Sequence, residues 1–350
     1  MSEDSQHVLS RRLRSGLAII LNRPEAINSL TESMIDRIDS LLDEAEADER
    51  CCFVLFYATG SKGFCAGGDI KELARLANLK QYDKVDSFFQ KEYGLDLKIH
   101  LFSKPVVVIA DGITMGGGLG IAAGADIRIA TDRTRMAMPE TRIGFFPDVG
   151  STGWMFTRCP KGYPEYLGLT GYDMQGTECV RLGFATHFIL HDHVQGLLDV
   201  LESVGLEDTQ DRQVTGKALL EQISGMLDFH IPDRFPMDAW VKEYFSDKAD
   251  IKDILAFLSR CGDQEERCNE VFASIAERSP TALVLTLKLL RYNEGRSIAD
   301  VFATELKAAK YMSRHPDYLE GIRARLIERD NNPHWQPDRI ELVDPSGFLF

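Results

Sequence analysis

Short apolar runs mark the candidate strands of this chain. They span residues 16–21 (GLAIIL), 53–57 (FVLFY), 106–110 (VVVIA) and 127–130 (IRIA). Apolar runs of this length are typical of strands that are buried on both faces. Between the first two runs, residues 31–47 repeat apolar side chains at three- and four-residue spacing with acidic residues on the other face, which predicts an amphipathic helix. This strand-then-helix order predicts an α/β domain over roughly residues 1–200.

The pattern changes in the second part of the chain, where strand signals stop beyond about residue 194. Helical periodicity is present in residues 216–227, 250–259, 280–292 and 298–313. Ser279 followed by Pro280 is typical of a helix start, with serine as the cap and proline at the first helical position. We therefore expect residues 201–350 to form a helical region, with an irregular tail from residue 331, packed on the core without a loose linker.

Composition and charge narrow the classes of function. The 350 residues are 44% hydrophobic and 27% charged, as in globular proteins, and the formal net charge is -14. This charge argues against nucleic acid and membrane surfaces as partners, because both attract clustered Lys and Arg. The longest apolar run is strand-sized, and the arginines near the N-terminus are mixed with acids, so we expect neither a membrane span nor a targeting segment.

The cysteine pattern bears on location and on metal binding. The odd count of seven without C-x-x-C spacing indicates neither a disulfide framework nor a zinc site, so we expect a reducing cytoplasm; the residues are Cys51, Cys52, Cys65, Cys159, Cys179, Cys261 and Cys268.

Two glycine-rich turns and one acidic turn carry the candidate chemistry. FCAGGD at Phe64 to Asp69 and MGGGLG at Met115 to Gly120 each follow an apolar run and precede a helical pattern. Such turns present backbone N–H groups at a helix start, and two that converge would make an oxyanion hole. The plain alternative is a tight strand-to-helix turn at each place. The segment from Met138 to Gly150 (MPETRIGFFPDVG) adds Glu140 and Asp148, which suit acid, base or nucleophile roles on a polarised carbonyl.

The order of these motifs resembles a known family. LNRPEAINSL at residues 21–30, FCAGGDIKEL at 64–73, GITMGGGLGIAAGADIRIAT at 112–131 and the MPETRIGFFPDVG segment are similar to the crotonase, or enoyl-CoA hydratase/isomerase, superfamily. Within it the chain most resembles the 3-hydroxyisobutyryl-CoA hydrolases, through FPDVG and the late SPTALVLTLK, EGIRARLIERD and PHWQP strings. The resemblance implies the ClpP/crotonase-like fold of repeated β-β-α units with a C-terminal helical region.

The resemblance also implies roles for site residues. The two oxyanion N–H groups fall on Gly68 and Gly117. Hydratases of the family carry one glutamate just after the triple glycine and one in the later P-E turn, whereas this chain has Gly120 at the first position and Glu140 at the second. Asp148 stands where hydratases typically have glycine. Hydration needs paired carboxylates to hold water, so this exchange favours thioester hydrolysis with Glu140 as base or nucleophile and Asp148 as its partner.

The implied substrate is an acyl-CoA thioester, with no metal or redox cofactor required. The coenzyme A moiety is expected near Gly68 and near Glu25, Ala26, Ile27, Ala66, Asp69, Ile70 and Lys71. Lys71 is a candidate phosphate contact, although a lone lysine on a helix is more often simply solvated. His191, Asp192 and His193 suggest a metal site, but the sequence shows no third ligand for it, so we expect no metal there. Cys65 lies beside the first glycine turn and is expected to pack rather than react.

Alternatives from other classes stay open at this point. Within enzymology, the rival is hydration or isomerisation of an enoyl-CoA. Outside it, the chain would be a non-catalytic acyl-CoA-binding protein or a secondary RNA binder. Family members often form trimers or hexamers, so a homo-oligomer also stays open. The acyl preference is in doubt because residues 150–154 (GSTGW) depart from the pattern common in these hydrolases.

Overall fold

The computed structural model describes residues 6–207, 209–227, 231, 234–235, 237–261 and 265–348. Contacts divide the chain into two compact units, each built from separate segments. The first comprises Met1–Gly68, Lys91–Met136 and Met174–Asp233, and the second comprises Asp69–Gln90, Ala137–Asp173 and Arg234–Phe350. This grouping is discontinuous in sequence, whereas the sequence suggested one boundary near residue 200. In the described part, no helix is both long and apolar enough to cross a membrane.

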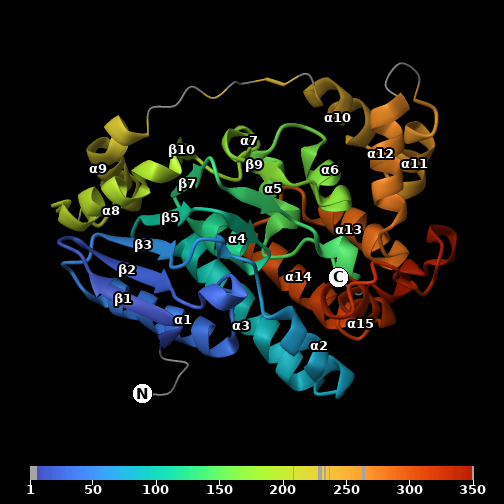
Figure 1. Cartoon of the computed structure of the whole chain (residues 1–350), viewed down its shortest axis with the longest axis horizontal. Coiled ribbons are helices and arrows are strands. Elements are labelled where there is room, and N and C mark those ends of the chain that lie inside the picture. Colours follow the sequence, from blue (N-terminus) through green and yellow to red (C-terminus); the bar gives the residue numbers. More distant parts are fainter. Residues whose placement is uncertain are drawn as a thin grey trace. The chain divides into compact units, whose positions relative to one another are not determined.

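The first unit is built on a six-stranded sheet (Figure 1). The strands lie in the order β1 (Val8–Arg12), β2 (Gly16–Leu21), β3 (Phe53–Ala58), β5 (Val106–Ala110), β7 (Ile127–Thr131) and β10 (His187–Ile189). The first pair is antiparallel and every other neighbouring pair is parallel. The four strands expected from short apolar runs are therefore confirmed, and their central position explains why they are apolar on both faces.

A second, four-stranded sheet carries shorter strands in the order β4 (Gly63–Cys65), β6 (Ile113–Met115), β8 (Arg135–Ala137) and β9 (Met174–Gln175). Strands β4 and β6 are parallel, with Gly63 opposite Ile113 and Cys65 opposite Thr114. Both glycine-rich segments of the sequence therefore leave parallel neighbouring strands at the same edge of this sheet.

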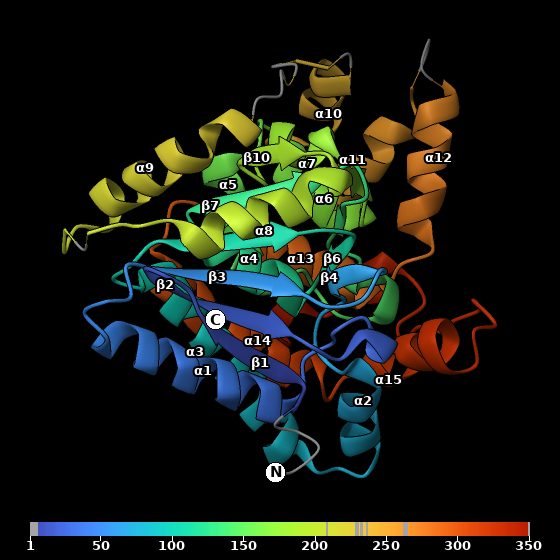
Figure 2. The same cartoon turned by 60° about the vertical axis from the view of Figure 1, so that its left-hand side comes forward.

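Helices cover both faces of the six-stranded sheet. Figure 2 shows α8 (Val194–Ser203) and α9 (Arg212–Ile223) on one face and α1 (Glu32–Ala47) on the other. Thr31 caps α1 by accepting a hydrogen bond from the Met34 N–H, and the helix buries the six apolar residues expected from the periodicity: Met34, Ile35, Ile38, Leu41, Leu42 and Ala45. Helix α9 begins at Arg212 because Asp211 caps it, a few residues before the start that the sequence suggested.

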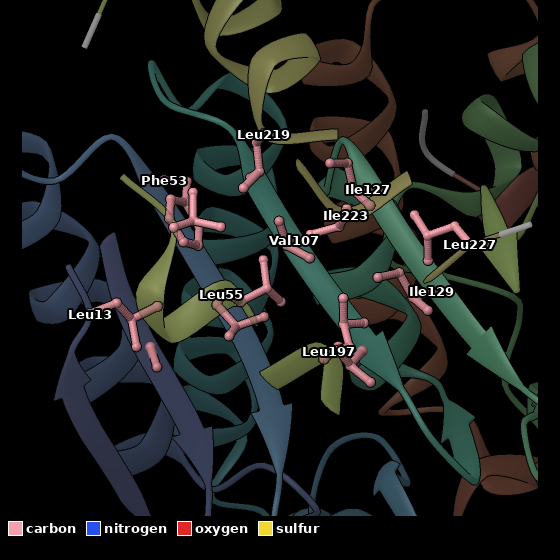
Figure 3. Packing of buried hydrophobic residues seen from close by; sticks show 14 of the residues in the cluster. Leu13, Phe53, Leu55, Val107, Ile127, Ile129, Leu197, Leu219, Ile223 and Leu227 are labelled. Carbon is pink, nitrogen blue, oxygen red and sulfur yellow. The ribbon is translucent and has the colours of Figure 1, made fainter. Parts of the chain in front are cut away.

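One hydrophobic core cluster of the first unit lies between the sheet and helices α8 and α9. Figure 3 shows Phe53, Leu55, Val107, Ile127 and Ile129 projecting from neighbouring strands toward Leu197, Leu219, Ile223 and Leu227. Burying a leucine, isoleucine or phenylalanine side chain contributes roughly 1.5–3 kcal/mol, so this cluster is a main source of stability for the unit.

The second unit is mainly helical. It contains α2 (Ile70–Asn78), α5 (Ser151–Arg158), α6 (Tyr163–Thr170), α10 (Met237–Phe245), α11 (Ile251–Leu258), α12 (Glu265–Ala276), α13 (Pro280–Asn293), α14 (Ile298–Met312) and α15 (Pro316–Ile322), most of them visible in Figure 1. Ser279 caps α13 through the Ala282 N–H, as the sequence predicted. In the described part of the chain, every element after β10 is helical, which confirms the expected change of pattern.

The cysteines correct one expectation. Cys261, which follows α11, and Cys268 of α12 are joined by a disulfide, although the sequence indicated no disulfide framework. Spacing alone gave no sign of this pair, because the two residues meet only through the packing of two neighbouring helices. The other five cysteines form no disulfide.

Candidate active site

The two glycine turns lie side by side in the first unit. Gly67 adopts a φ of +102°, a conformation that favours glycine, and a β-carbon on it would lie 3.3 Å from the Met115 carbonyl oxygen and 3.4 Å from the Gly117 nitrogen. The turn that contains Gly68 therefore contacts the turn that contains Gly117. Their convergence, which the oxyanion-hole hypothesis requires, is present in the backbone.

Gly117 is the first residue of α4 (Gly117–Gly124), and Gly116 precedes it with a φ of 48°. The first N–H groups of a helix have no partner within the helix and carry partial positive charge. Among the backbone hydrogen bonds found outside regular elements in the described residues, none is donated by Gly68 or Gly117. The oxyanion role of these two N–H groups stays a prediction.

Two buried carboxylates that sequence reasoning missed lie under this helix. Glu92 and Asp96 stand one turn apart on α3 (Tyr82–Leu101), with exposures of 3% and 0%. A β-carbon on Gly117 would lie 2.2 Å from Glu92 Oε1, and one on Gly120 would lie 2.2 Å from Asp96 Oδ2. Position 120, where the family resemblance implies a glutamate in hydratases, is glycine here, and the Asp96 carboxylate fills the space beside it.

The sequence held a signal for this pair. The buried positions of α3 include Val85, Phe89 and Ile99, which form an apolar stripe at helical spacing, and Glu92 and Asp96 fall within it. Acidic residues at apolar positions of an amphipathic helix are expected to have a specific role or partner.

Glu140 lies in the second unit, where the short 3-10 helix η3 (Glu140–Ile143) follows Pro139. Its carbonyl oxygen accepts hydrogen bonds from the N–H groups of Gly144 and Phe145, which close the turn. Gly144 has a φ of 69°, and a β-carbon there would lie 2.1 Å from the Asp317 carbonyl oxygen. The turn therefore needs glycine, and it holds Glu140 in a buried position with 8% exposure.

Asp148 lies in a strained turn of the same unit. The next residue, Val149, has a φ of 53°, which is rare for a β-branched residue and costs about 1–2 kcal/mol. The Asp148 carbonyl oxygen accepts from the Ser151 N–H at 2.9 Å, and the indole N–H of Trp154 donates to the Val149 carbonyl oxygen at 3.2 Å. Asp148 is 6% exposed. Backbone strain of this kind clusters at functional sites.

An aromatic cluster fixes the segment between the two carboxylates. The Phe145 ring stacks on Phe146 at 4.6 Å and on Phe89 at 5.3 Å, and it contacts Tyr318 at 5.6 Å. Each such pair contributes roughly 0.5–1.5 kcal/mol beyond the apolar area that it buries. The segment from Glu140 to Asp148 is thus held at both ends and in the middle.

The residues expected near coenzyme A are found in three places. In the first unit, the Ala66 N–H donates to the Ile27 carbonyl oxygen at 3.0 Å, so the turn of Glu25, Ala26 and Ile27 contacts the first glycine turn. In the second unit, Asp69 caps α2, which begins at Ile70.

Lys71 is exposed on α2 and lines a cavity of about 650 Å³ between this helix and the α15 region. Arg323, also in this cavity, makes ion pairs with Glu320, Glu328 and Asp330, so its charge is already balanced. Lys71 is therefore the better candidate for contact with a phosphate.

The structure also shows what surrounds Cys65 and His191, two residues for which the sequence predicted no reactive or metal-binding role. Burial raises the pKa of the Cys65 thiol to about 12, so Cys65 is a neutral packing residue at physiological pH. His191 Nδ1 lies 3.0 Å from a carboxylate oxygen of Asp111, and its Nε2 lies 2.9 Å from the Arg133 guanidinium. Within the described residues, no group of three or more His, Cys, Asp or Glu side chains is placed to hold a metal ion.

Comparison with known proteins places these features in a family. The model of a family described as enoyl-CoA hydratase/isomerase matches residues 17–348. The chain belongs to the enoyl-CoA hydratase/isomerase family. The expected crotonase fold is confirmed by a solved structure, a carnitinyl-CoA dehydratase from Mycobacterium thermoresistibile, with a TM-score of 0.86, 31% identity, and coverage of 98% of this chain and 95% of that one.

Two curated proteins are similar to the chain over nearly its whole length. The chain is 33% identical over 345 residues to the mitochondrial 3-hydroxyisobutyryl-CoA hydrolase of Gallus gallus, covering 98% of this chain and 87% of the relative. It is also 33% identical over 367 residues to small ribosomal subunit protein mS47 of Neurospora crassa, covering 99% and 71%. The chicken relative is named as mitochondrial, so the expected cytoplasmic location is not confirmed.

Proposed function

We propose that this protein is an acyl-CoA thioester hydrolase that acts on 3-hydroxyisobutyryl-CoA or a close relative. The observation that carries the proposal is the contact between the two glycine turns, with the Gly117 N–H at the start of α4. The similarity to a 3-hydroxyisobutyryl-CoA hydrolase across 98% of the chain supports hydrolysis as the reaction.

In the proposed mechanism the thioester carbonyl oxygen accepts hydrogen bonds from the N–H groups of Gly68 and Gly117. These bonds strengthen as negative charge develops on that oxygen, and in other enzymes removal of one such donor costs about 3–4 kcal/mol. The coenzyme A part would lie along Glu25, Ala26, Ile27, Ala66, Asp69, Ile70 and Lys71. No metal or redox cofactor is needed for these steps.

Glu140 would act on the carbonyl carbon in one of two ways. As a base, its carboxylate takes a proton from water while the water oxygen bonds to the carbon. The carbon–sulfur bond then breaks, and the proton returns to the departing thiolate. As a nucleophile, a carboxylate oxygen displaces the thiolate and forms an anhydride, which water then hydrolyses to the acid and free Glu140. Asp148 would orient Glu140 or accept a hydrogen bond from the substrate hydroxyl.

One observation favours a second candidate, the hydration of an enoyl-CoA. Asp96 lies where a side chain at Gly120 would begin, so it could supply the second carboxylate that hydratases have. A dehydratase is among the similar solved structures. Hydration adds water across a carbon–carbon double bond and releases no thiol, so the two reactions are separated by their products.

Two non-enzymatic hypotheses are weaker. A binding protein would not need the buried Glu140 and Asp148 in strained or glycine-dependent turns. A role like that named for the Neurospora crassa relative would bring RNA close, which the net charge of -14 disfavours. A homo-oligomer and a cytoplasmic location stay predictions.

The proposal is tested by following free thiol release from a panel of acyl-CoA thioesters with and without a 3-hydroxyl group. We expect turnover that is fastest on short, branched 3-hydroxyacyl thioesters. Binding of the panel without release of thiol would support the acyl-CoA-binding hypothesis instead.

A further inference from the structure

We propose that Glu305 is a positioning residue that holds the turn carrying Asp148 in the conformation that hydrolysis requires. This inference rests on the proposed function, because the turn has a catalytic purpose only if Asp148 takes part in the reaction. Glu305 lies on α14 and is fully buried, with 0% exposure.

The Glu305 carboxyl group caps the start of α5 from another helix. Its Oε2 accepts a hydrogen bond from the Gly150 N–H at 2.6 Å, and its Oε1 accepts from the Thr152 N–H at 3.1 Å and the Thr152 Oγ1–H at 2.5 Å. These backbone groups belong to the first turn of a helix, where no intrahelical acceptor exists. Gly150 is the N-cap and has no side chain to cap the helix itself, so Glu305 supplies the acceptor.

The turn needs such support because it contains an unfavourable backbone conformation. Val149 lies between Asp148 and Gly150 with a φ of 53°. A β-branched residue stays in this region only when its surroundings impose it. The Trp154 indole holds the Val149 carbonyl oxygen, and Glu305 holds the N–H of the next residue, Gly150. These two bonds fix the peptide unit between Val149 and Gly150 from both sides.

The helices around Glu305 are packed to keep it in place. Asn293 of α13, also fully buried, donates from Nδ2 to Thr152 Oγ1 at 2.9 Å, which leaves the Thr152 hydroxyl proton for Glu305. Gly153 allows close approach of α14, because a β-carbon there would lie 2.5 Å from Val301 Cγ2. Val301 and Glu305 are four residues apart and share one face of α14. Figure 1 shows α13 and α14 in the same region as α5.

The charge state of Glu305 suits this role. Burial raises the pKa of Glu305 to about 8, the hydrogen bonds from Thr152 and Gly150 oppose that rise, and the nearby Asp148 carboxylate adds to it. At neutral pH Glu305 is therefore mainly protonated. A neutral Glu305 holds the turn without adding a second negative charge beside Asp148.

Glu165 provides a matched control. It is also a buried glutamate of the second unit, with 2% exposure, and burial likewise raises its pKa. Its ion-pair partner is Arg291 of α13, at 2.5 Å, and not a residue of the Asp148 turn. A general effect of removing a buried carboxylate will appear in both Glu165→Gln and Glu305→Gln, whereas an effect on the turn will appear only in the second.

The experiment measures thiol release and amide hydrogen exchange in the wild type, Glu305→Gln, Glu305→Ala and Glu165→Gln. The amide side chain in Glu305→Gln would keep an oxygen for Thr152 but place an NH2 group opposite the Gly150 N–H. We expect kcat to fall at least about tenfold in Glu305→Gln and further in Glu305→Ala, with KM within about twofold, because a small displacement of a reacting group acts mainly on kcat. The amides of residues 148–153 should exchange faster in the same order, and Glu165→Gln should keep wild-type kcat and exchange in this segment.

A second pair of variants covers the case in which the Glu305 variants do not fold. Thr152→Val removes the hydroxyl at nearly constant volume, and with it both the bond to Glu305 and the bond from Asn293, whereas Thr152→Ser keeps both. We expect the valine variant to lose kcat several-fold relative to the serine variant, in line with the loss of these supporting hydrogen bonds. Wild-type kcat or unchanged exchange in the folded Glu305 variants, or equal kcat in the two Thr152 variants, overturns the inference. If the wild type itself releases no thiol, the proposed function fails instead.

Discussion

The Asp96 carboxylate occupies the space that a side chain at Gly120 would need, with Oδ2 2.2 Å from the point where a β-carbon would stand. The glycine at position 120 is therefore required by a partner on another helix, and not only by the helix of which it is part. Gly120 stands where hydratases of the family have glutamate, and the buried Asp96 on α3 fills the space beside it.

This relationship predicts the effect of Gly120→Ala. The added methyl group has no room, so the free energy of unfolding should fall by roughly 1–3 kcal/mol, as is common for overpacked cores. Asp96→Ala should relieve the contact, so the double variant should be more stable than the sum of the two single changes predicts. Urea unfolding of the four proteins measures this coupling. Additive effects would mean that the two residues do not share the space.

Glu140 should be essential for turnover. Glu140→Gln keeps the size of the side chain but cannot accept a proton or attack a carbonyl, so kcat should fall at least about 100-fold. Thiol release gives kcat, and thermal unfolding shows whether the fold is retained. Glu165→Gln is the control for loss of a buried carboxylate. Near-normal hydrolysis by the Glu140 variant would remove this residue from the mechanism.

Gly117→Val should separate the reaction from coenzyme A binding. Its side chain would meet the Glu92 carboxylate, since even a β-carbon would lie 2.2 Å from Oε1, and the turn would shift. We expect a loss of kcat of at least about 100-fold, the size seen when an oxyanion donor is removed, with a much smaller change in affinity for free coenzyme A. Calorimetry beside steady-state kinetics distinguishes the two. Parallel loss of both, at an unchanged melting temperature, would assign the turn to nucleotide binding.

Glu305 should make stability depend on pH. Its folded-state pKa of about 8 lies above the ordinary value of 4.5, so between these values the folded protein holds a proton that the unfolded chain has lost. The contribution is complete below about pH 4.5 and is lost as the pH rises through about 8, with a slope of up to about 1.4 kcal/mol per pH unit. Urea unfolding across this range should show a flatter pH dependence in Glu305→Gln. Identical slopes in variant and wild type would contradict the assignment.

The parts of the fold that follow from local patterns were accessible from the sequence. Helix α1 and the central strands depend on periodicity within a few residues, and the two glycine turns depend on residues that need unusual backbone angles or close approach. Each of these features depends on a short stretch of neighbouring residues, so the local sequence pattern is enough to predict it.

The supporting residues of the candidate site could not be found in the same way. Asp96 meets Gly120 from a different helix, and Glu305 meets Gly150 and Thr152 from a helix far along the chain. Glu305 falls in the apolar stripe of α14, between Val301 and Ala308, which marks it as a buried acid but does not show which helix it caps. These contacts matter because the backbone at Val149 is strained, and this strain can be recognised only from the backbone angles of the folded chain.

We expect this protein to hydrolyse an acyl-CoA thioester and not to hydrate an enoyl-CoA. The direct measurement compares two initial rates of the wild-type protein: thiol release from 3-hydroxyisobutyryl-CoA and loss of the double bond of crotonyl-CoA. Thiol release should be at least about 100-fold faster, because the carboxylate that hydratases carry at position 120 is absent. Rapid hydration of crotonyl-CoA without thiol release would contradict it and assign the second carboxylate to Asp96.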